Sequence, residues 1–184
     1  MKTIKVKEMM VPLAEYATVS EDATLFEAVM ALEEAQKTFA QDRYRHRAVL
    51  VFDGNNRIVG KLSQLDVIRG LEEGYNKIGD LKGISHTGFS PEFIKSLIQS
   101  YELWQKPMDD ICRSAVRVKV RDIMYTPTEG EFVEADAFLD EAIHQLVMGR
   151  HQSLLVTGES GIVGILRLTD VFTEICNTMK ACEV

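Results

Sequence analysis

The chain contains an internal repeat. Residues 58–67, IVGKLSQLDV, and residues 162–171, IVGILRLTDV, place the same residue types in the same order 104 positions apart. Each copy reads as an apolar β-type run around a glycine, followed by an Asp near the expected start of a helix. Two copies of one unit predict a single pseudo-symmetric module built from two similar halves.

The duplication extends toward the beginning of each copy. The motif VKEMM at residues 6–10 matches VRDIM at residues 120–124, at an offset of 114 rather than 104. The first copy therefore carries ten extra residues between positions 32 and 48. A longer helix through residues 33–41 is the simplest explanation.

Each copy predicts the order short strand, helix, strand, strand, helix. In the first copy, residues 47–52 and 57–62 predict a hairpin around the turn sequence DGNN, and residues 153–156 and 162–166 repeat it. A unit of about 55 residues can hardly cover its apolar sheet face alone. The sequence therefore predicts an α/β fold of the α+β type, in which two β-α-β-β-α repeats pack sheet to sheet about a pseudo-two-fold axis.

A long connection separates the copies. We expect repeat 1 at residues 1–72, a connecting segment at 73–118 and repeat 2 at 119–184. Ser90, followed by proline, is a helix start signal, and apolar residues at helical spacing predict a helix near 91–104. We expect this stripe to pack in the core or at a dimer contact; docking of a partner protein is the alternative. The stripe comprises Phe93, Ile94, Leu97, Ile98 and Tyr101.

Composition limits the partners. A net charge of -7 and a pI near 5.2 argue against nucleic-acid binding, which needs a basic face. The three cysteines form no C-x-x-C pair and have no histidine at metal-ligand spacing, so reduced thiols and no metal site are expected. The first residues are charged and no run has the length of a membrane span. We expect a cytoplasmic protein without a membrane partner.

Enzyme motifs are missing from the sequence. It contains no Walker motif, no G-x-S-x-G and no H-E-x-x-H, and its four histidines are scattered. Adjacent carboxylates at 33–34 and 109–110 point in different directions on a helix and suit a solvated face. We therefore expect no catalytic residues, and any regulated target would be another polypeptide.

The paired copies and the pattern G-x-x-[ST]-x-x-D resemble a tandem pair of cystathionine-β-synthase (CBS) domains, or Bateman module. The resemblance covers nearly the whole chain apart from the connecting segment. It implies two related clefts between the repeats and assembly as a flat homodimer. It also implies binding of an adenine nucleotide, AMP, ADP or ATP, with S-adenosylmethionine as a further candidate.

The residues of the repeated pattern suit this chemistry. Asp66 and Asp170 can accept hydrogen bonds from ribose hydroxyls, and Ser63, at a helix N-terminus, suits phosphate oxygens. In the second copy Arg167 replaces the family's Ser or Thr, and Thr169 occupies another position that donates to phosphate in some members. Arg167 can either clamp a phosphate or fill the cleft. The alternative for each Asp is simple N-capping of a helix, although finding the pattern twice favours ligand binding.

A basic cluster at residues 43–47 precedes a strand in this acidic chain. Its pair His46 and Arg47 is similar to a His-Arg pair that meets phosphates in a nucleotide-sensing member of the family. The second copy has the reversed pair, Arg150 and His151. The alternative is a solvated helix end, where cations lie favourably at the negative pole of the preceding helix.

The resemblance also suggests the adenine contacts, namely Ala17 through its backbone and Thr126 through its hydroxyl. The resulting hypothesis is a regulatory sensor that binds an adenine nucleotide between its repeats and transmits a conformational change to a partner. The alternative is an interaction module with degenerate clefts, for which Arg167 is the best argument from sequence.

Overall fold

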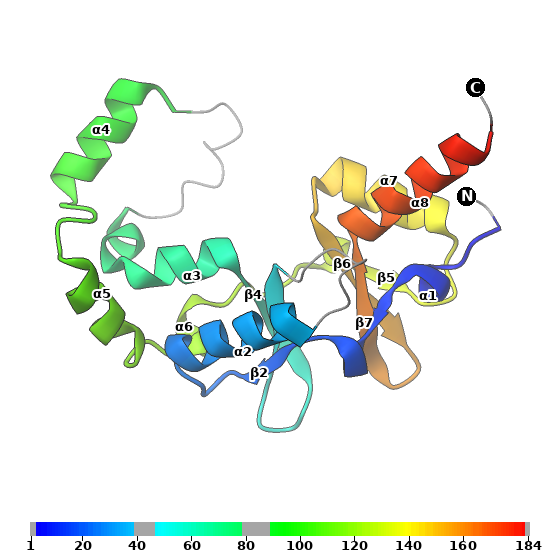
Figure 1. Cartoon of the computed structure of the whole chain (residues 1–184), viewed down its shortest axis with the longest axis horizontal. Helices are drawn as coiled ribbons and strands as arrows, with labels where there is room; N and C mark the ends of the chain where they lie inside the picture. Colours follow the sequence, from blue (N-terminus) through cyan, green and yellow to red (C-terminus); the bar gives the residue numbers. More distant parts are fainter. Residues whose placement is uncertain (1–2, 39–46, 79–88, 183–184) are drawn as a thin grey trace.

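The computed structural model describes residues 3–38, 47–78 and 89–182. Two sheets form its centre, one in the order β2-β3-β4 and the other in the order β1-β7-β6-β5 (Figure 1). The strands are β1 (Val11–Pro12), β2 (Thr18–Ser20), β3 (Ala48–Phe52), β4 (Ile58–Ser63), β5 (Phe132–Glu134), β6 (Ser153–Gly158) and β7 (Gly161–Arg167). The α-helices are α1 (Val6–Met9), α2 (Leu25–Thr38), α3 (Gln64–Leu71), α4 (Pro91–Ser100), α5 (Met108–Ala115), α6 (Val120–Ile123), α7 (Leu139–Gly149) and α8 (Leu168–Ala181). Short 3-10 helices are η1 (Leu13–Glu15), η2 (Glu73–Lys77) and η4 (Glu129–Glu131).

The first hairpin follows from its turn chemistry. β3 and β4 pair antiparallel, as β6 and β7 do in the second repeat. The Asp53 carboxylate accepts hydrogen bonds from the backbone N–H groups of Asn55 (2.8 Å) and Arg57 (2.9 Å), which closes the loop. Asn56 adopts a left-handed φ of 59°, a conformation that Asn tolerates well. Both predicted hairpins are confirmed.

Alternation along the central strands builds three apolar layers. On β3, Val49 and Val51 face the helices of the first repeat, and Leu50 belongs to the layer between the two sheets. The middle layer unites both repeats through Val11, Tyr16, Leu50, Leu155 and Ile165. The predicted α+β fold with sheets packed face to face is confirmed.

The extra residues of the first repeat lengthen its first helix. α2 has 14 residues and its counterpart α7 has 11. Residues 39–46 lie outside the described part of the chain, so the remainder of the predicted helix through residue 41 stays a prediction.

The pseudo-symmetry holds for individual hydrogen bonds. The N–H of Val6 donates to the carbonyl of Ala137 (3.0 Å), and the equivalent N–H of Val120 donates to the carbonyl of Ala23 (2.9 Å). Each of these bonds joins the leading segment of one repeat to the other repeat. Val6 is accordingly buried in the second repeat's core and Val120 in the first repeat's core.

The first segment of each repeat thus crosses over to the other repeat, and the residues that follow continue this crossing and position the site. Val11 of β1 pairs with Ile165 of β7, and the equivalent Tyr125 pairs with Lys61 of β4. The first loop of each repeat therefore lies beside the other repeat's last strand. That strand runs directly into the helix that carries the Asp of the repeated pattern.

In the connecting segment, α5 contributes Ala115 to the first repeat's core, whereas α4 has no buried residue. α4 begins as predicted, with the Ser90 hydroxyl accepting a hydrogen bond from the N–H of Phe93 (3.2 Å), but it ends at Ser100 rather than near residue 104. Core packing of its apolar stripe was a wrong prediction, since Phe93, Ile94 and Ile98 are 41%, 45% and 39% exposed. The helical spacing is real, yet α4 lies apart from both sheets (Figure 1). The dimer-contact interpretation stays a prediction.

The residues after α4 are nevertheless fixed to the first repeat. The buried Glu72 carboxylate accepts hydrogen bonds from the backbone N–H groups of Gly74 (2.9 Å) and Trp104 (2.8 Å). Leu103 beside it is only 3% exposed. Glu72 therefore fixes the turn that follows α4 to the end of the first repeat, although α4 itself projects from the molecule.

Candidate functional site

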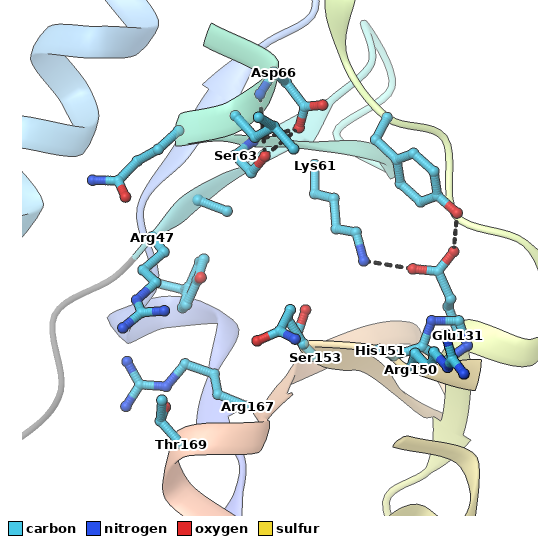
Figure 2. A pocket seen from close by; sticks show the side chains of 16 residues that line it. Arg47, Lys61, Ser63, Asp66, Glu131, Arg150, His151, Ser153, Arg167 and Thr169 are labelled. Atoms are coloured by element: carbon cyan, nitrogen blue, oxygen red, sulfur yellow. Dashed lines mark hydrogen bonds and ion pairs between the residues drawn. The ribbon is translucent and has the colours of Figure 1, made fainter. Parts of the chain in front are cut away.

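A groove of about 460 Å³ lies between the repeats, within the size range of small-molecule sites. Figure 2 shows Ser63 and Asp66 on one side of it, with Arg167 and Thr169 on the opposite side. The first repeat contributes Tyr16, Arg47, Ala48, Lys61, Ser63, Gln64, Leu65 and Asp66. The second contributes Tyr125, Glu131, Arg150, His151, Gln152, Ser153, Arg167 and Thr169.

The pattern residues of the first repeat form a capping box at the start of α3. Ser63 is the N-cap, and one carboxylate oxygen of Asp66, Oδ2, accepts from the Ser63 N–H (2.8 Å) and hydroxyl (2.6 Å). Asp66 is therefore not itself the N-cap, which corrects the capping interpretation. Within the described residues no hydrogen bond to Oδ1 is recorded, so this oxygen can accept from a ligand hydroxyl. The Ser63 proton, in contrast, already points to Asp66.

The pattern residues of the second repeat are arranged differently. Arg167 is the N-cap of α8 and is buried, with 6% of its surface exposed. Its guanidinium donates from Nε to Oδ2 of Asp170 and from Nη2 to Oδ1, both at 2.6 Å. This bidentate pair engages both carboxylate oxygens. Arg167 and Thr169 line the groove, whereas Asp170 is not among its lining residues.

A charged network that sequence reasoning missed crosses the groove. Glu131 is 2% exposed, and its carboxylate accepts from the Lys61 ammonium (2.5 Å) and the Tyr125 hydroxyl (2.5 Å). The Lys61 nitrogen also lies 5.1 Å from the centre of the Tyr125 ring, within cation-π range. Because Lys61 is on β4 and Glu131 on η4, the ion pair joins the two repeats.

The ionisation of the network follows from these contacts. Burial opposes the charged form of Glu131, but hydrogen bonds from Lys61, Tyr125 and the Thr128 N–H together hold the pKa of Glu131 below its ordinary value. The hydrogen bond donated to Glu131, followed by burial, raises the pKa of Tyr125 to about 12. At neutral pH the network therefore contains the Glu131 carboxylate and a neutral Tyr125 phenol.

Comparison of the two copies contained the signal for this network. Lys61 corresponds to Ile165 in the second copy, and Glu131 corresponds to Ala17 in the first. A charged residue in one copy where the other has an apolar one was therefore visible at both positions. The sequence could not show that the two charges meet, because their contact depends on the crossing of the leading segments.

Arg47 and Arg150 bring further positive charge to the groove. Both are exposed and, in the described part of the chain, neither has a recorded ion pair. Arg150 ends α7 in the left-handed conformation, with φ of 52° and ψ of 36°, which is unfavourable for a residue with a Cβ. His46, predicted beside Arg47, lies outside the described residues.

The hairpins define how these basic residues correspond. The carbonyl of Arg47 accepts from the Gln64 N–H, and the carbonyl of Gln152 accepts from the Leu168 N–H in the same way. Gln152 is therefore the counterpart of Arg47. Arg150, the first residue of the reversed pair, lies two positions before Gln152 and is not equivalent to Arg47. His151 lines the groove and packs so closely on Gly149 that a Cβ there would overlap its imidazole.

The predicted adenine contacts fall just outside the groove lining. Ala17 and Thr126 are not among the lining residues, whereas their neighbours Tyr16 and Tyr125 are. Tyr16 is buried in the layer between the sheets, and burial raises its pKa to about 12. Tyrosine rings therefore border the groove where the two first loops approach it.

Across residues 3–38, 47–78 and 89–182, no group of three or more His, Cys, Asp or Glu side chains could hold a metal ion. None of the helices in these ranges has the length and apolar content to cross a membrane.

Solved structures share this fold at low sequence identity. A CBS domain-containing protein of unknown function from Bacillus anthracis aligns with a TM-score of 0.62 and 15% identity, covering 96% of this chain and 95% of that chain. A putative acetoin utilization protein (AcuB) from Vibrio cholerae aligns with a TM-score of 0.59 and 19% identity, covering 98% and 96%. The CBS domain of a bacterial CNNM/CorC family Mg2+ transporter in complex with ATP gives 0.59 and 18%, covering 95% and 89%.

The sequence comparisons agree with this fold. No curated protein matches the chain. The CBS domain model, however, matches residues 6–73 and again residues 120–177, which together make up more than half of the chain. These regions coincide with the two copies of the internal repeat. The chain therefore belongs to the CBS domain family and carries two CBS domains in tandem.

Proposed function

We propose that this protein is a cytoplasmic regulatory sensor that binds an adenine nucleotide in the groove between its CBS domains. Binding changes the relation between the repeats, and a partner protein on another chain responds to that change. The proposal rests on the chemistry of the groove, which combines a hydrogen-bond acceptor for ribose with cations for phosphate.

The observation that carries the proposal is the environment of Asp66. Its Oδ1 can accept from ribose hydroxyls, and the N-terminus of α3 beside it favours negative charge. Four Lys and Arg side chains line the groove together with His151, and two carboxylates, Asp66 and Glu131, accompany them. Arg47 and Arg150 have no recorded ion pair among the described residues, so they are the best candidates for phosphate contact.

This charge distribution favours AMP, ADP or ATP over S-adenosylmethionine, which carries a positive sulfonium and no phosphate. The ATP complex of the CNNM/CorC family CBS domain supports the choice of ligand class through a related fold. A longer polyphosphate gains from both Arg47 and Arg150, and the order ATP over ADP over AMP is therefore expected.

Transmission to a partner requires an element that differs between the bound and free states. The Lys61–Glu131 ion pair connects the repeats and lies on the groove wall, so a bound anion competes for the same ammonium. Large apolar side chains on the outer helices are exposed, and we propose that they form the homodimer contact. They are Phe26 and Met30 on α2, Leu65 and Ile68 on α3, Val147 and Met148 on α7, and Phe172 and Met179 on α8.

The second candidate function is an interaction module without a ligand. Two observations favour it, namely the Arg167–Asp170 pair in the second repeat and the exposed apolar face of α4. In this case the groove is a structural seam, and recognition of the partner occurs on the connecting segment.

Isothermal titration of the protein with AMP, ADP, ATP, adenosine and S-adenosylmethionine at fixed salt separates these functions. The sensor predicts micromolar binding of at least one phosphate-bearing ligand and weak binding of S-adenosylmethionine. Absence of heat with every ligand, repeated at two temperatures to avoid an enthalpy near zero, supports the interaction module.

Two substitutions localise the ligand. Asp66→Ala removes the charge-assisted ribose contact and should weaken every adenosine-containing ligand by roughly 10- to 100-fold. Arg47→Ala should weaken ATP more than adenosine, because only ATP carries phosphate. Lys180→Ala, which removes an exposed charge near the end of α8, is the matched control and should leave all affinities unchanged. Equal losses for ATP and adenosine in the Arg47 variant would contradict its phosphate role.

A further inference from the structure

We propose that the two ribose-binding positions are not equivalent. Arg167 donates hydrogen bonds to both carboxylate oxygens of Asp170, and each chain therefore binds one nucleotide, at Asp66. This inference rests on the proposed function and specifies which half of the groove performs it. It also answers the question that the sequence left open, because Arg167 fills its cleft instead of clamping a phosphate.

The two carboxylates differ in which oxygens they have available. In the first repeat both bonds from Ser63 go to Oδ2 of Asp66, which lines the groove, and no hydrogen bond to its Oδ1 is present among the described residues. In the second repeat the Arg167 guanidinium spans both oxygens of Asp170 at 2.6 Å, and Asp170 does not reach the groove lining. Only Asp66 can therefore accept from the two hydroxyls of a ribose without first losing a partner.

Burial makes the second pair difficult to open. The Arg167 side chain is 7% exposed and the Asp170 side chain 19% exposed, so water stabilises the separated charges poorly. A ribose hydroxyl that displaced the guanidinium would exchange two charge-assisted bonds for neutral donors and would leave a buried cation without its carboxylate. We expect the affinity at Asp170 to be at least about 100-fold below that at Asp66.

The surroundings of the pair reinforce the closure. Tyr16 is 7% exposed. It lies close enough to the pair that the charge of Arg167 lowers the pKa of Tyr16 and the charge of Asp170 raises it, although burial has the larger effect. The ring belongs to the loop that approaches α8 through the crossing of the leading segments. In the first repeat the residue at the N-cap is the small Ser63, which leaves more room beside its Asp.

The test is the stoichiometry of ATP binding by isothermal titration, with chain concentration measured by amino-acid analysis. Wild type should bind one ATP per chain. Asp66→Asn should weaken ATP binding by roughly 10- to 100-fold, whereas Asp170→Asn should leave the affinity of the single site within about threefold. Arg167→Ser introduces the first repeat's residue at the second N-cap and should raise the stoichiometry to two, with a second affinity within tenfold of the first.

Each outcome decides between the inference and the proposed function. Two ATP per wild-type chain with similar affinities, or loss of binding in Asp170→Asn but not in Asp66→Asn, overturns the inference and leaves the nucleotide sensor standing. No binding of AMP, ADP or ATP to wild type removes the proposed function itself. Circular dichroism and thermal unfolding check each variant, and if neither substitution in the second repeat folds, the wild-type stoichiometry with Asp66→Asn still decides.

Discussion

The ion pair between Lys61 and Glu131 offers a test of how the groove holds the repeats together, because the chain supplies its own apolar replacement. Lys61 corresponds to Ile165 in the other repeat and Glu131 corresponds to Ala17. The substitutions Lys61→Ile and Glu131→Ala therefore introduce residues that already pack at the equivalent positions. The two single variants and the double variant form a double-mutant cycle.

The magnitudes follow from burial. Lys61→Ile leaves Glu131, 2% exposed, as a charge held only by Tyr125 and Thr128, and should lower the free energy of unfolding by about 3 kcal/mol. Glu131→Ala leaves the Lys61 ammonium without its carboxylate; because that side chain is 17% exposed and reaches some water, the cost should be about 2 kcal/mol. The double variant leaves no unpaired charge and should lose only about 2 kcal/mol in total. The coupling energy is then about 3 kcal/mol.

Urea unfolding monitored by circular dichroism measures all four proteins at pH 7 and one fixed chain concentration, since dimerisation would otherwise change the apparent stability. A change in the slope of the transition would show that the denatured or native state had changed and would disqualify that variant from the cycle. Additive single variants, with a coupling energy below about 0.5 kcal/mol, would refute the reasoning that the pair is a desolvated link between repeats.

Two further results are expected. Arg150→Gly places a glycine at the left-handed position that ends α7 and should stabilise the fold by about 1 kcal/mol in thermal unfolding. The same variant should bind ATP about tenfold more weakly by titration. An unchanged ATP affinity would show that Arg150 only ends the helix and does not contact phosphate. Hydrogen bonds from Lys7 and Lys5 lower the pKa of Asp136 from 3.8 to about 2, so the stability they provide is present above about pH 4 and is lost as the pH falls toward 2. Asp136→Asn should flatten this part of the stability profile in acid titrations, and an unchanged profile would contradict the assignment.

The sequence predicted the elements that depend on local pattern. The strands, both hairpin turns and the start of α4 at Ser90 follow from alternation, turn residues and capping, and the structure has them. The exposure of α4 was not predictable in the same way, because helical spacing shows that a face is apolar but not what covers it. Core packing was expected because an apolar stripe in a compact chain was assumed to pack against another part of the same chain.

The site was predictable as positions and not as contacts. Six of the ten proposed residues line the groove, namely Arg47, Ser63, Asp66, Arg150, His151 and Thr169. Of the others, Ala17, Thr126 and Asp170 lie outside the lining, and His46 lies outside the described residues. The bidentate ion pair of Arg167 and Asp170 depends on the rotamer of a long side chain. The Lys61–Glu131 ion pair joins residues that are 70 positions apart. Neither contact leaves a periodic signal in the sequence.

The distribution of differences between the two copies adds an argument about function. Where the leading segments cross, the copies retain equivalent bonds, as between Val6 and Ala137 and between Val120 and Ala23. The copies also share the Asp of the repeated pattern, but at the groove they differ in charge at four other positions: Ser63 against Arg167, Lys61 against Ile165, Glu131 against Ala17 and Arg47 against Gln152. A groove that served only as a structural seam would have no reason to concentrate its differences there, since the same packing would suit both halves. One half equipped to receive an anionic nucleotide, and the other closed by its own arginine, accounts for both the shared frame and the divergent lining.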